Sequence, residues 1–578
     1  MATQRINETL RSDMWRACDY LRRDNNVAGV LQYTEHIAWL LFLKFLDEEE
    51  KRRKDVADFE GRTYEAVLPK DIAWDAWASP EKVKKWDANE LIQFVRGRLL
   101  PGLATLTGSD LAKTIARIFS DESVGDQNVV RNVPVCASGY NLKEVLGVIN
   151  TIKFEREEDR FTITDFYEQL LVKMGTEGGT GGEFHTPRPV IRFMVDVVAP
   201  QVDGKSEQET VYDPAFGSAG FLAQAFLYMD KNAKTIEDHE FLQQKAFHGK
   251  EKKGIAALLG LMNLVLHGVS APDHLIRGNT LEEPIKGSVE SRYDIVLTNP
   301  PFGGTEGRHI QQNFPVQANA TELLFLEHII KKLKNTPNAR CAMVVPEGTL
   351  FRGGAFAQVK KNLLEQFHLF AVISLPPGTF SPYSDVKTAL LFFKRPDEVL
   401  EKNPQARHET WFYEMQLPEG LKKFSKGSPI ADEHFTETRE MWKKWKCYLN
   451  GESERPFEMS AEIRGRWQAN FAWDAYRKAI EDGDAEAKPP QPVPEDRPAI
   501  RDAYTAEGPR PQGPYTTWVE LLDDLAAHDF DLSAHNPNQD DRITLPHPAE
   551  ITTRLMERTR EFKNILEHLH SIISNGEE

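Results

Sequence analysis

Residues 293–302 have the sequence YDIVLTNPPF, an apolar run that stops at Asn299-Pro300-Pro301-Phe302. The run predicts a buried strand, and the two prolines end it because they fix φ and lack backbone N–H donors. Asn299 then offers a side-chain carbonyl, Pro300 a backbone carbonyl and Phe302 an aromatic face. Together these groups suit a planar ring with an exocyclic amine. A plain turn after a strand is the alternative.

Short β-rich runs alternate with helical stretches on both sides of this motif, from about residue 160 to residue 400. The runs are 210–212, 246–248, 275–277, 293–297, 340–345, 369–375 and 387–393. Helical patterns between them include 220–230, 255–267 and 322–333. This alternation predicts an α/β fold with a mostly parallel sheet and helices on both faces. Ligands of such sheets bind at the carboxyl ends of the strands, so motifs just after strands are the candidates.

A second motif, VYDPAFGSAGFL at residues 211–222, takes a strand through a turn of small residues into a helix. Gly217 and Gly220 allow the backbone to approach a ligand at the start of the helix. Asp213, at the tip of the strand, can bind an ammonium group. The motif is neither GxGxxG nor GxxxxGK[ST], which disfavours a dinucleotide and excludes a P-loop. A turn of this kind also arises by chance.

A third motif, FHGKE at residues 247–251, places Glu251 at the end of the next strand. An acidic residue there commonly binds ribose hydroxyls. Glu251 lies farther from Asp213 than the usual spacing of about 20 residues, and an inserted loop at 230–240 would explain the difference. The alternative is a solvated glutamate among lysines.

A fourth motif, GGEFHTPRP at residues 181–189, precedes a predicted helix at 190–198. Phe184 and His185 could stack on a ligand or bond to it, whereas Thr186 can cap the helix with Pro187 in its first turn. No second histidine or carboxylate stands at ligand spacing from His185, so we expect no metal site.

The composition limits the class of protein. The chain has 578 residues and a net charge of −17, so it has no chain-wide cationic field that would attract nucleic acid. Four scattered cysteines without a CxxC pair suit a reducing compartment. We expect a cytoplasmic protein, because the N-terminus lacks a signal peptide and the apolar run at 37–46 is too short for a membrane span.

Four parts follow from these patterns. We expect a helical N-terminal domain at 1–155, an α/β domain at 156–425, an irregular Pro-rich extension or lid at 426–547, and a C-terminal helix at 548–578. Apolar residues of the last segment follow four- and three-residue steps, which favours a coiled-coil arm for a partner subunit. A helix docked on its own domain is the alternative.

The order GEFHTPRP, DPAFGSAGF, HGKE, GNTL and NPPF resembles the amino-methyltransferases that act on N6 of adenine in DNA. Residues 31–48, residues 380–393 and the C-terminal helix resemble more closely the modification (methyltransferase) subunit of type I restriction–modification systems. This resemblance implies a Rossmann-like core that uses S-adenosylmethionine, an all-α N-terminal domain and a C-terminal helical arm. The extension at about 430–540 is longer than the resemblance leads us to expect.

The resemblance also implies a role for each motif. The residues that would hold S-adenosylmethionine are Glu183, Phe184, His185, Thr186, Pro187, Arg188, Asp213, Gly217, Ser218, Ala219, Gly220, Glu251 and Asn279. Glu251 would bind the ribose, and Asn279, where many relatives carry Asp, would lie near the adenine ring of the cofactor. The residues that would hold the target adenine are Asn299, Pro300, Pro301 and Phe302.

The partners implied by the resemblance are double-stranded DNA with the adenine flipped out, a specificity subunit, a second copy of this chain and a motor–nuclease restriction subunit. A separate specificity subunit fits the acidic charge, because no clear basic recognition domain is present. Two alternatives remain: a related methyltransferase that acts on RNA or on protein glutamine, and a scaffold subunit that has lost catalysis. Intact Asp213, Glu251 and Asn299 argue against the scaffold.

Overall fold

The computed structural model describes residues 2–120, 133, 135–154, 162–164, 166–171, 173, 186–203, 207–269, 272–285, 291–381, 384–463, 478, 479, 488, 517–533, 536 and 537. One compact unit contains residues 1–458 and 517–534, and a second contains 459–516 and 535–578. The sheet and the candidate site belong to the first unit. The predicted C-terminal helix at 548–578 and most of the Pro-rich stretch lie outside the described residues.

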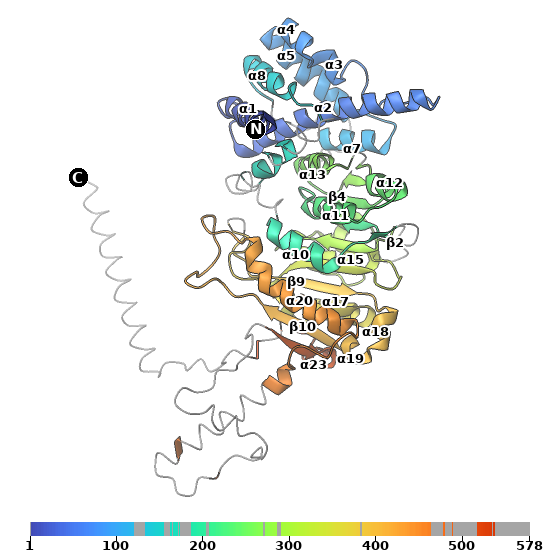
Figure 1. Ribbon diagram of the computed structural model, residues 1–578, viewed down its shortest axis with the longest axis vertical. Helices are drawn as coiled ribbons and strands as arrows, with labels where there is room; N and C mark the ends of the chain where they lie inside the picture. The colour runs from blue at the N-terminus through green and yellow to red at the C-terminus, as the bar shows by residue number, and fades with distance from the viewer. Residues whose placement is uncertain are drawn as a thin grey trace, which may run out of the picture. The chain divides into compact units, whose positions relative to one another are not determined.

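The N-terminal part is helical, as predicted (Figure 1). Its helices are α1 (Ala2–Arg22), α2 (Val30–Phe59), α3 (Trp74–Trp77), α4 (Pro80–Lys85), α5 (Ala88–Phe94), α6 (Leu100–Ala104), α7 (Asp110–Phe119) and α8 (Gly139–Ile149), with a π-helical turn at Val95–Leu99. Trp39, Trp74 and Trp77 are buried in its core. Because α2 and α7 contact α13 (Gly254–His267), the helical part packs directly on the α/β part.

A nine-stranded sheet forms the centre of the α/β part. Its strands are β3 (Val211–Asp213), β4 (Phe247–Glu251), β5 (Leu275–Arg277), β6 (Ile295–Thr298), β7 (Arg340–Pro346), β8 (His368–Ser374), β9 (Thr388–Lys394), β10 (Glu409–Glu414) and β11 (Thr517–Leu521). The order across the sheet is β11-β10-β8-β9-β7-β6-β3-β4-β5. Only β9 and β11 run against the other strands. The predicted α/β class with a mostly parallel sheet is confirmed.

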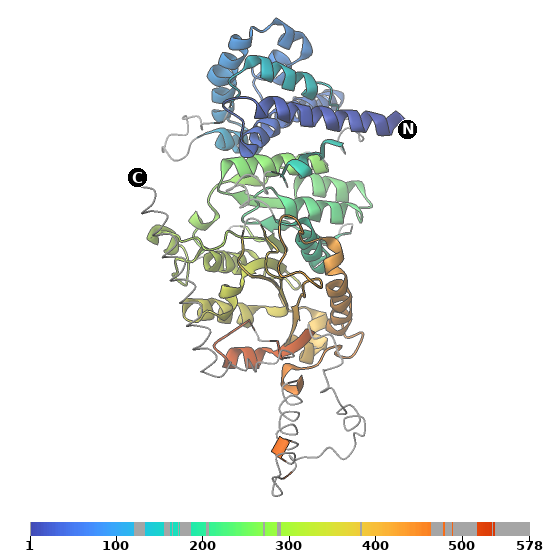
Figure 2. The same cartoon turned by 90° about the vertical axis from the view of Figure 1, so that its left-hand side faces the viewer.

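Helices lie on both faces of this sheet (Figures 1 and 2). On one face, α11 (Gly220–Asp230) contacts α10 (Arg188–Val198), α13 and α12 (Ile236–Gln244). On the other, α15 (Thr321–Lys332) contacts α17 (Ala355–Gln366). Tyr212 points to this second face, where its hydroxyl lies 3.2 Å from Nε2 of His328 in α15. The sheet is therefore covered on both faces, which explains why its strands are almost continuously apolar.

Shorter elements complete the first unit. They are α14 (Arg308–Gln311), α16 (Glu347–Phe351), α18 (Glu398–Lys402), α19 (Pro404–Arg407), α20 (Thr436–Leu449), α23 (Leu522–Ala527), the 3-10 turns Thr280–Glu282 and Asp432–Phe435, and the hairpin of β1 (Val202–Asp203) and β2 (Glu207–Gln208). Part of the extension predicted as irregular is thus ordered, because α20 is a helix and β11 pairs with β10 at the edge of the sheet.

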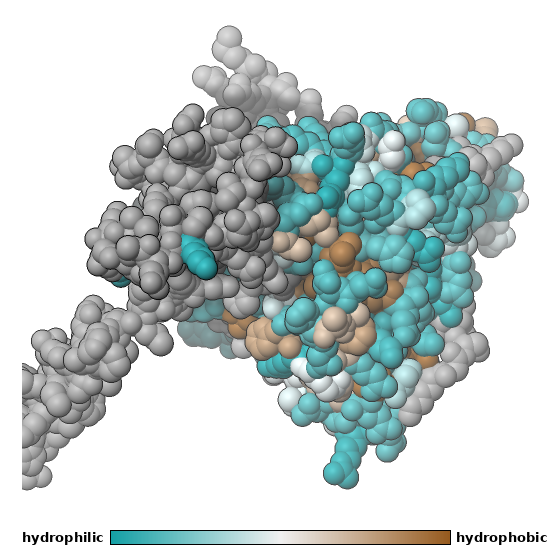
Figure 3. Space-filling view, turned by 90° about the horizontal axis from the view of Figure 1, so that it is seen from below, coloured by the Kyte–Doolittle hydropathy of each residue, from teal (hydrophilic) through white to brown (hydrophobic). Residues whose placement is uncertain are grey.

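No helix in the described ranges is both long enough and apolar enough to cross a bilayer. On the face shown in Figure 3, hydrophobic residues form scattered areas among hydrophilic ones.

Arg340 at the start of β7 fixes the end of α10. Its guanidinium makes paired hydrogen bonds to Glu209 at 2.6 and 2.8 Å, and it also donates to the carbonyls of Val198 at 2.7 Å and Ala199 at 2.9 Å. The arginine is 5% exposed, so these carbonyls and the carboxylate have little access to water. The ion pair therefore holds α10 against the sheet at the end opposite to the candidate site.

We predict that Arg340→Met destabilises the fold by about 3–5 kcal/mol, because it leaves the Glu209 carboxylate without its buried partner. Arg98→Met is the matched control: Arg98 pairs with Asp71 at the exposed surface, and its loss should cost less than about 1 kcal/mol. Thermal unfolding of both variants beside the parent chain measures the difference. Equal midpoints for the two variants would contradict this account of α10.

Candidate active site

The candidate site lies where three neighbouring strands end. β6, β3 and β4 are adjacent and parallel, so their carboxyl ends lie at one edge of the sheet. Asp213 is the last residue of β3, Glu251 is the last residue of β4, and Asn299 directly follows β6. The structure thus brings together three of the four sequence motifs, and α10 adds the fourth from above the sheet.

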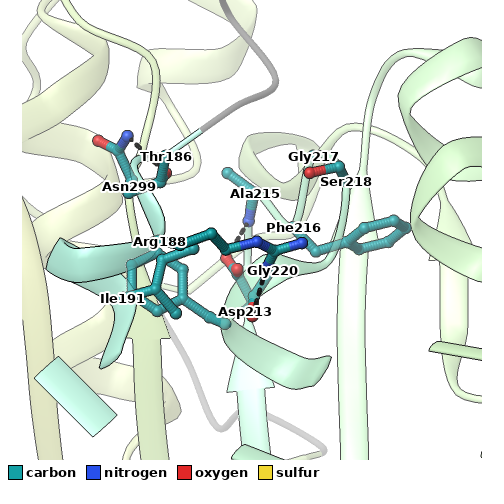
Figure 4. A pocket seen from close by; sticks show the side chains of 11 residues that line it. Thr186, Arg188, Ile191, Asp213, Ala215, Phe216, Gly217, Ser218, Gly220 and Asn299 are labelled. Atoms are coloured by element: carbon teal, nitrogen blue, oxygen red, sulfur yellow. Dashed lines mark hydrogen bonds between the residues drawn. The ribbon is translucent and has the colours of Figure 1, made fainter. Parts of the chain in front are cut away.

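An open cavity lies at this edge (Figure 4). The residues that line it are Thr186, Arg188, Ile191, Asp213, Ala215, Phe216, Gly217, Ser218, Gly220, Phe221 and Asn299. Predicted cofactor residues and the predicted target residue Asn299 therefore share one cavity.

The turn between β3 and α11 is tightly packed against its neighbours. Ala219, the N-cap of α11, has φ of 55° and ψ of 31°, a left-handed conformation that non-glycine residues rarely adopt. A Cβ on Gly220 would lie 2.8 Å from Ile191 Cδ1 and 2.9 Å from Arg188 Nη1, so a larger residue there would require these two side chains to move. The carbonyl of Ser218 accepts a hydrogen bond from the buried Asn263 of α13 at 2.8 Å. The turn is consequently held from two sides.

Asp213 is a buried carboxylate at the centre of the site. Its Oδ1 accepts hydrogen bonds from the Thr298 hydroxyl at 2.7 Å and from the backbone N–H of Ala215 at 3.0 Å. Burial raises the pKa of Asp213 to about 7, and the two hydrogen bonds oppose that rise. A cationic ligand would strongly stabilise the ionised form of such a buried carboxylate, because the ligand replaces the stabilisation that water would give.

Glu251 reaches across to the same turn. Its two oxygens accept hydrogen bonds from the backbone N–H groups of Gly217 at 3.0 Å and Lys253 at 2.8 Å. Burial raises the pKa of Glu251, and the backbone donors oppose the rise. Glu251 thus supports the β3 turn, and it does not line the cavity of Figure 4.

Asn279 lies farther along the same edge, outside the cavity lining. Its side chain caps the 3-10 turn by accepting from the N–H of Leu281 at 3.2 Å. Glu251 and this turn are linked, since the N–H of Gly278 donates to the Glu251 carbonyl at 2.8 Å.

Asn299 lines the cavity and carries an acceptor without a partner among the described residues. Its amide nitrogen donates to the Thr186 hydroxyl at 3.0 Å, and this bond orients the side chain as Figure 4 shows. The carbonyl Oδ1 is buried and has no hydrogen-bond partner among the described residues. Since a buried polar atom without a partner costs about 1–3 kcal/mol, Asn299 Oδ1 is poised to accept from a ligand.

The three predicted residues after Asn299 are not among those that line the cavity. Pro300 is buried, Pro301 is exposed and Phe302 is half-buried. The ring of Phe302 meets Phe380 edge to face, with centroids 6.0 Å apart. Phe302 therefore has one supported edge and keeps part of its surface open to solvent.

The predicted cap of α10 was wrong. The helix begins at Arg188, Pro187 occupies the N-cap, and no side chain caps it. The Thr186 hydroxyl accepts instead from Asn299. Thr186 thus links α10 to the end of β6. The predicted cofactor residues Glu183, Phe184 and His185 lie outside the described residues.

Sequence reasoning missed a set of polar residues that hold Arg188. This partly buried arginine approaches the Gly220 carbonyl at 3.4 Å and pairs with Glu168 at 3.1 Å. Glu168 also contacts His267 at 3.1 Å, and His267 donates through Nδ1 to the Asn263 carbonyl at 2.8 Å. Burial opposes the ionisation of Glu168, but His267 and Arg188 outweigh it and lower its pKa to about 2.

Some signal for these residues was present in the sequence. Asn263 and His267 are four residues apart in the otherwise apolar run 255–267, which places them on one face of a helix. Thr298 is the polar end of the apolar run before Asn299. Glu168 had no such signal, because its segment shows no distinctive pattern. Within the described ranges, no group of three or more His, Cys, Asp or Glu could hold a metal ion.

Comparison with known proteins matches this arrangement. The family model for N-6 DNA methylases matches residues 158–499, and the model for the HsdM N-terminal domain matches residues 10–147. The methylase subunit of the type I restriction enzyme EcoEI from Escherichia coli is 37% identical over 431 residues, which cover 73% of this chain and 81% of that protein. The EcoKI methylase subunit from Escherichia coli K12 is 30% identical and covers 80% of each chain.

A solved structure agrees with these relatives. A chain determined in work on complex assembly and conformational transition of the type I R-M system is 46% identical, with a TM-score of 0.74. The match covers 98% of this chain and 99% of that chain. The chain therefore belongs to the N-6 DNA methylase family and, within it, to the methylase subunits of type I restriction enzymes.

Proposed function

We propose that the cavity binds S-adenosylmethionine and that Asn299 holds the target adenine of DNA for methylation at N6. The observation that carries this proposal is the buried, unpartnered Oδ1 of Asn299 in the same cavity as Asp213. When bound, S-adenosylmethionine supplies an activated methyl group on its sulfonium. The protein contributes alignment and electrostatics.

The residues present fit this cofactor. Asp213 supplies a negative charge for the ammonium group, and the absence of a Cβ at Gly220 lets the Arg188 side chain lie close to the turn. Arg188, held by Glu168, supplies a partly buried positive charge for a carboxylate. Glu251 would bind the ribose, which requires it to exchange one of its backbone hydrogen bonds, and Asn279 would lie near the cofactor's adenine.

Asn299 would act on the target base. Adenine N6 is a poor nucleophile because its lone pair is delocalised into the ring. Asn299 Oδ1 and the carbonyl of Pro300 would accept its two hydrogens and favour a more pyramidal nitrogen, and Pro301 would keep the turn rigid. The open surface of Phe302 would stack on the ring. A base inside a duplex cannot reach this cavity, so it must be flipped out.

The partners follow from charge and from the relatives. With a net charge of −17, the chain needs a partner to gain affinity for DNA. We therefore propose that a separate specificity subunit selects the sequence, that two copies of this chain join it, and that a motor–nuclease subunit adds cleavage. Residues 548–578 would be the arm that contacts the partner. Tight, sequence-specific binding to duplex DNA by this chain alone would contradict the proposal.

The alternatives considered from the sequence are less favoured. The matched family acts on DNA, which argues against RNA or protein glutamine as the substrate. An inactive scaffold would have no reason to keep an orphan acceptor and a buried carboxylate in one cavity.

We predict that Asn299→Ala lowers methyl transfer at least about 100-fold, as expected for the loss of a preorganised polar group, and leaves cofactor binding intact. Transfer of labelled methyl groups to duplex DNA by the assembled complex measures the first effect, and calorimetry the second. Asn232→Ala, at an exposed asparagine after α11, is the control and should behave as the parent. An Asn299→Ala variant that still methylates at the parent rate would contradict the mechanism.

We also predict that affinity for S-adenosylmethionine falls as the pH drops below about 7. The pKa of Asp213 is about 7, so its carboxylate is charged above that pH and becomes neutral below it, when it no longer attracts an ammonium group. The cofactor's own amine titrates nearby, so Asp213→Asn serves as the reference. At pH 8 the Asp213→Asn variant should bind S-adenosylmethionine more weakly than the parent does. The affinity of the variant should also change less with pH than the affinity of the parent. Identical pH profiles for the two proteins would exclude Asp213 as the partner of the ammonium group.

A further inference from the structure

The single-turn helix α16, directly after β7, holds an exposed phenylalanine on a rigid support. Phe351 is 56% exposed, whereas Thr349 and Leu350 before it are buried. The carbonyl of Leu350 accepts hydrogen bonds from the buried Lys360 ammonium and from the backbone N–H of Leu532. An aromatic ring that is exposed on an anchored turn loses little conformational entropy when it binds, which is typical of a contact surface.

The exit from this turn is equally constrained. Gly354, the N-cap of α17, has φ of 65° and ψ of −125°, a conformation that is open essentially only to glycine. A Cβ on Gly353 would lie 2.9 Å from the Asp529 carboxylate. The chain therefore leaves Phe351 along a fixed path.

The register of the sheet places this turn at the catalytic edge. β6 and β7 are parallel neighbours, with Thr298 opposite Met343. Phe302 follows Thr298 by four residues, and Glu347, the first residue of α16, follows Met343 by four residues. The two segments thus leave the same edge of the sheet side by side.

A series of contacts joins the two segments. The N–H of Thr321, at the start of α15, donates to the carbonyl of Gly304 at 3.1 Å. The next residue, Glu322, pairs with Arg352 at 3.6 Å. The loop that follows Phe302 is therefore linked through α15 to the residue beside Phe351.

A second path runs through the loop before β9. Phe380 in this loop contacts the ring of Phe302, and the carbonyl of Lys387 at its end accepts from the N–H of Glu347 at 2.9 Å. Val386, beside Lys387, is another exposed hydrophobic residue. Phe351 and Arg352 follow β7, whereas Val386 and Lys387 precede β9, and these four residues are here named the β7 rim.

The charges of the rim indicate which contact it makes. Arg352 pairs with Glu322, and Lys387 pairs with Glu347 at 3.0 Å. The basic side chains are thus largely neutralised by neighbouring carboxylates. Phe351 and Val386 are the exposed apolar side chains of the rim, and Phe351 is the one with a ring; an apolar wedge suits stacked bases better than phosphates.

We propose that Phe351 is a wedge that inserts into the base stack of DNA beside the target adenine and stabilises the flipped-out state. This inference rests on the proposed function, because it requires a duplex substrate. Unstacking and unpairing a base cost free energy, and a side chain that fills the vacated space recovers part of it. Phe351 would thus affect the opening of the duplex and would not affect the binding of the cofactor in the cavity.

The test compares two DNA substrates in the assembled complex. Both are duplexes with the methylation site of the complex; in one the target adenine is paired with thymine, and in the other it faces an abasic position. Phe351→Ala should lower kcat/KM on the paired duplex about tenfold, which corresponds to part of the cost of opening one base pair. It should lower kcat/KM less than about twofold on the abasic duplex, where opening costs little. Phe59→Ala, at the exposed end of α2, is the matched control.

Each outcome decides the proposal. Parent rates for Phe351→Ala on the paired duplex would overturn it, and so would an equal loss on both duplexes, since Phe351 would then act on something other than opening. An unchanged affinity for S-adenosylmethionine confirms that the variant is folded. If the parent complex methylates neither duplex, the proposed function fails, and that result is distinct from a failure of the wedge.

Discussion

One hydrogen bond joins the two halves of the site: the Thr298 hydroxyl donates to Asp213 at 2.7 Å. It connects the end of β6, which carries Asn299, to the end of β3, which opens the turn around the cavity. Both side chains are buried, so the bond forms in a medium where an unpaired carboxylate would be costly. The position of Asn299 relative to the cofactor turn therefore depends on the strand order β6-β3 and on this bond.

Several features that cost folding stability lie together in the site. Asp213 and Glu251 are buried carboxylates whose pKa values are raised by burial, Ala219 adopts a left-handed conformation, and Asn299 keeps an unpaired acceptor. Each of these costs stability. A ligand that binds the carboxylates and the acceptor together would explain why they gather at one edge of the sheet.

Much of this arrangement could be predicted from local sequence. The run before Asn299 and the run before Pro214 are strands within two residues of their predicted bounds, because apolar runs between turn residues carry a strong strand signal. The prediction that both motifs meet at one edge required only that the sheet be parallel. By contrast, β11 joins the sheet from residues 517–521, about a hundred residues after β10, and a pairing at that separation leaves no local pattern. The ion pair of Glu168 with Arg188 could not be predicted either, because the segment around Glu168 shows no distinctive pattern.

The central claim is that this chain directs N6 methylation of adenine in DNA, and a genome-wide map of N6-methyladenine in the native host tests it most directly. The map is compared between the host with the gene and the host from which it is deleted. The account predicts that a two-part sequence motif loses adenine methylation in the deletion and regains it when the gene is restored, since a separate subunit selects the site. If the chain is produced and no adenine motif changes, the account is contradicted.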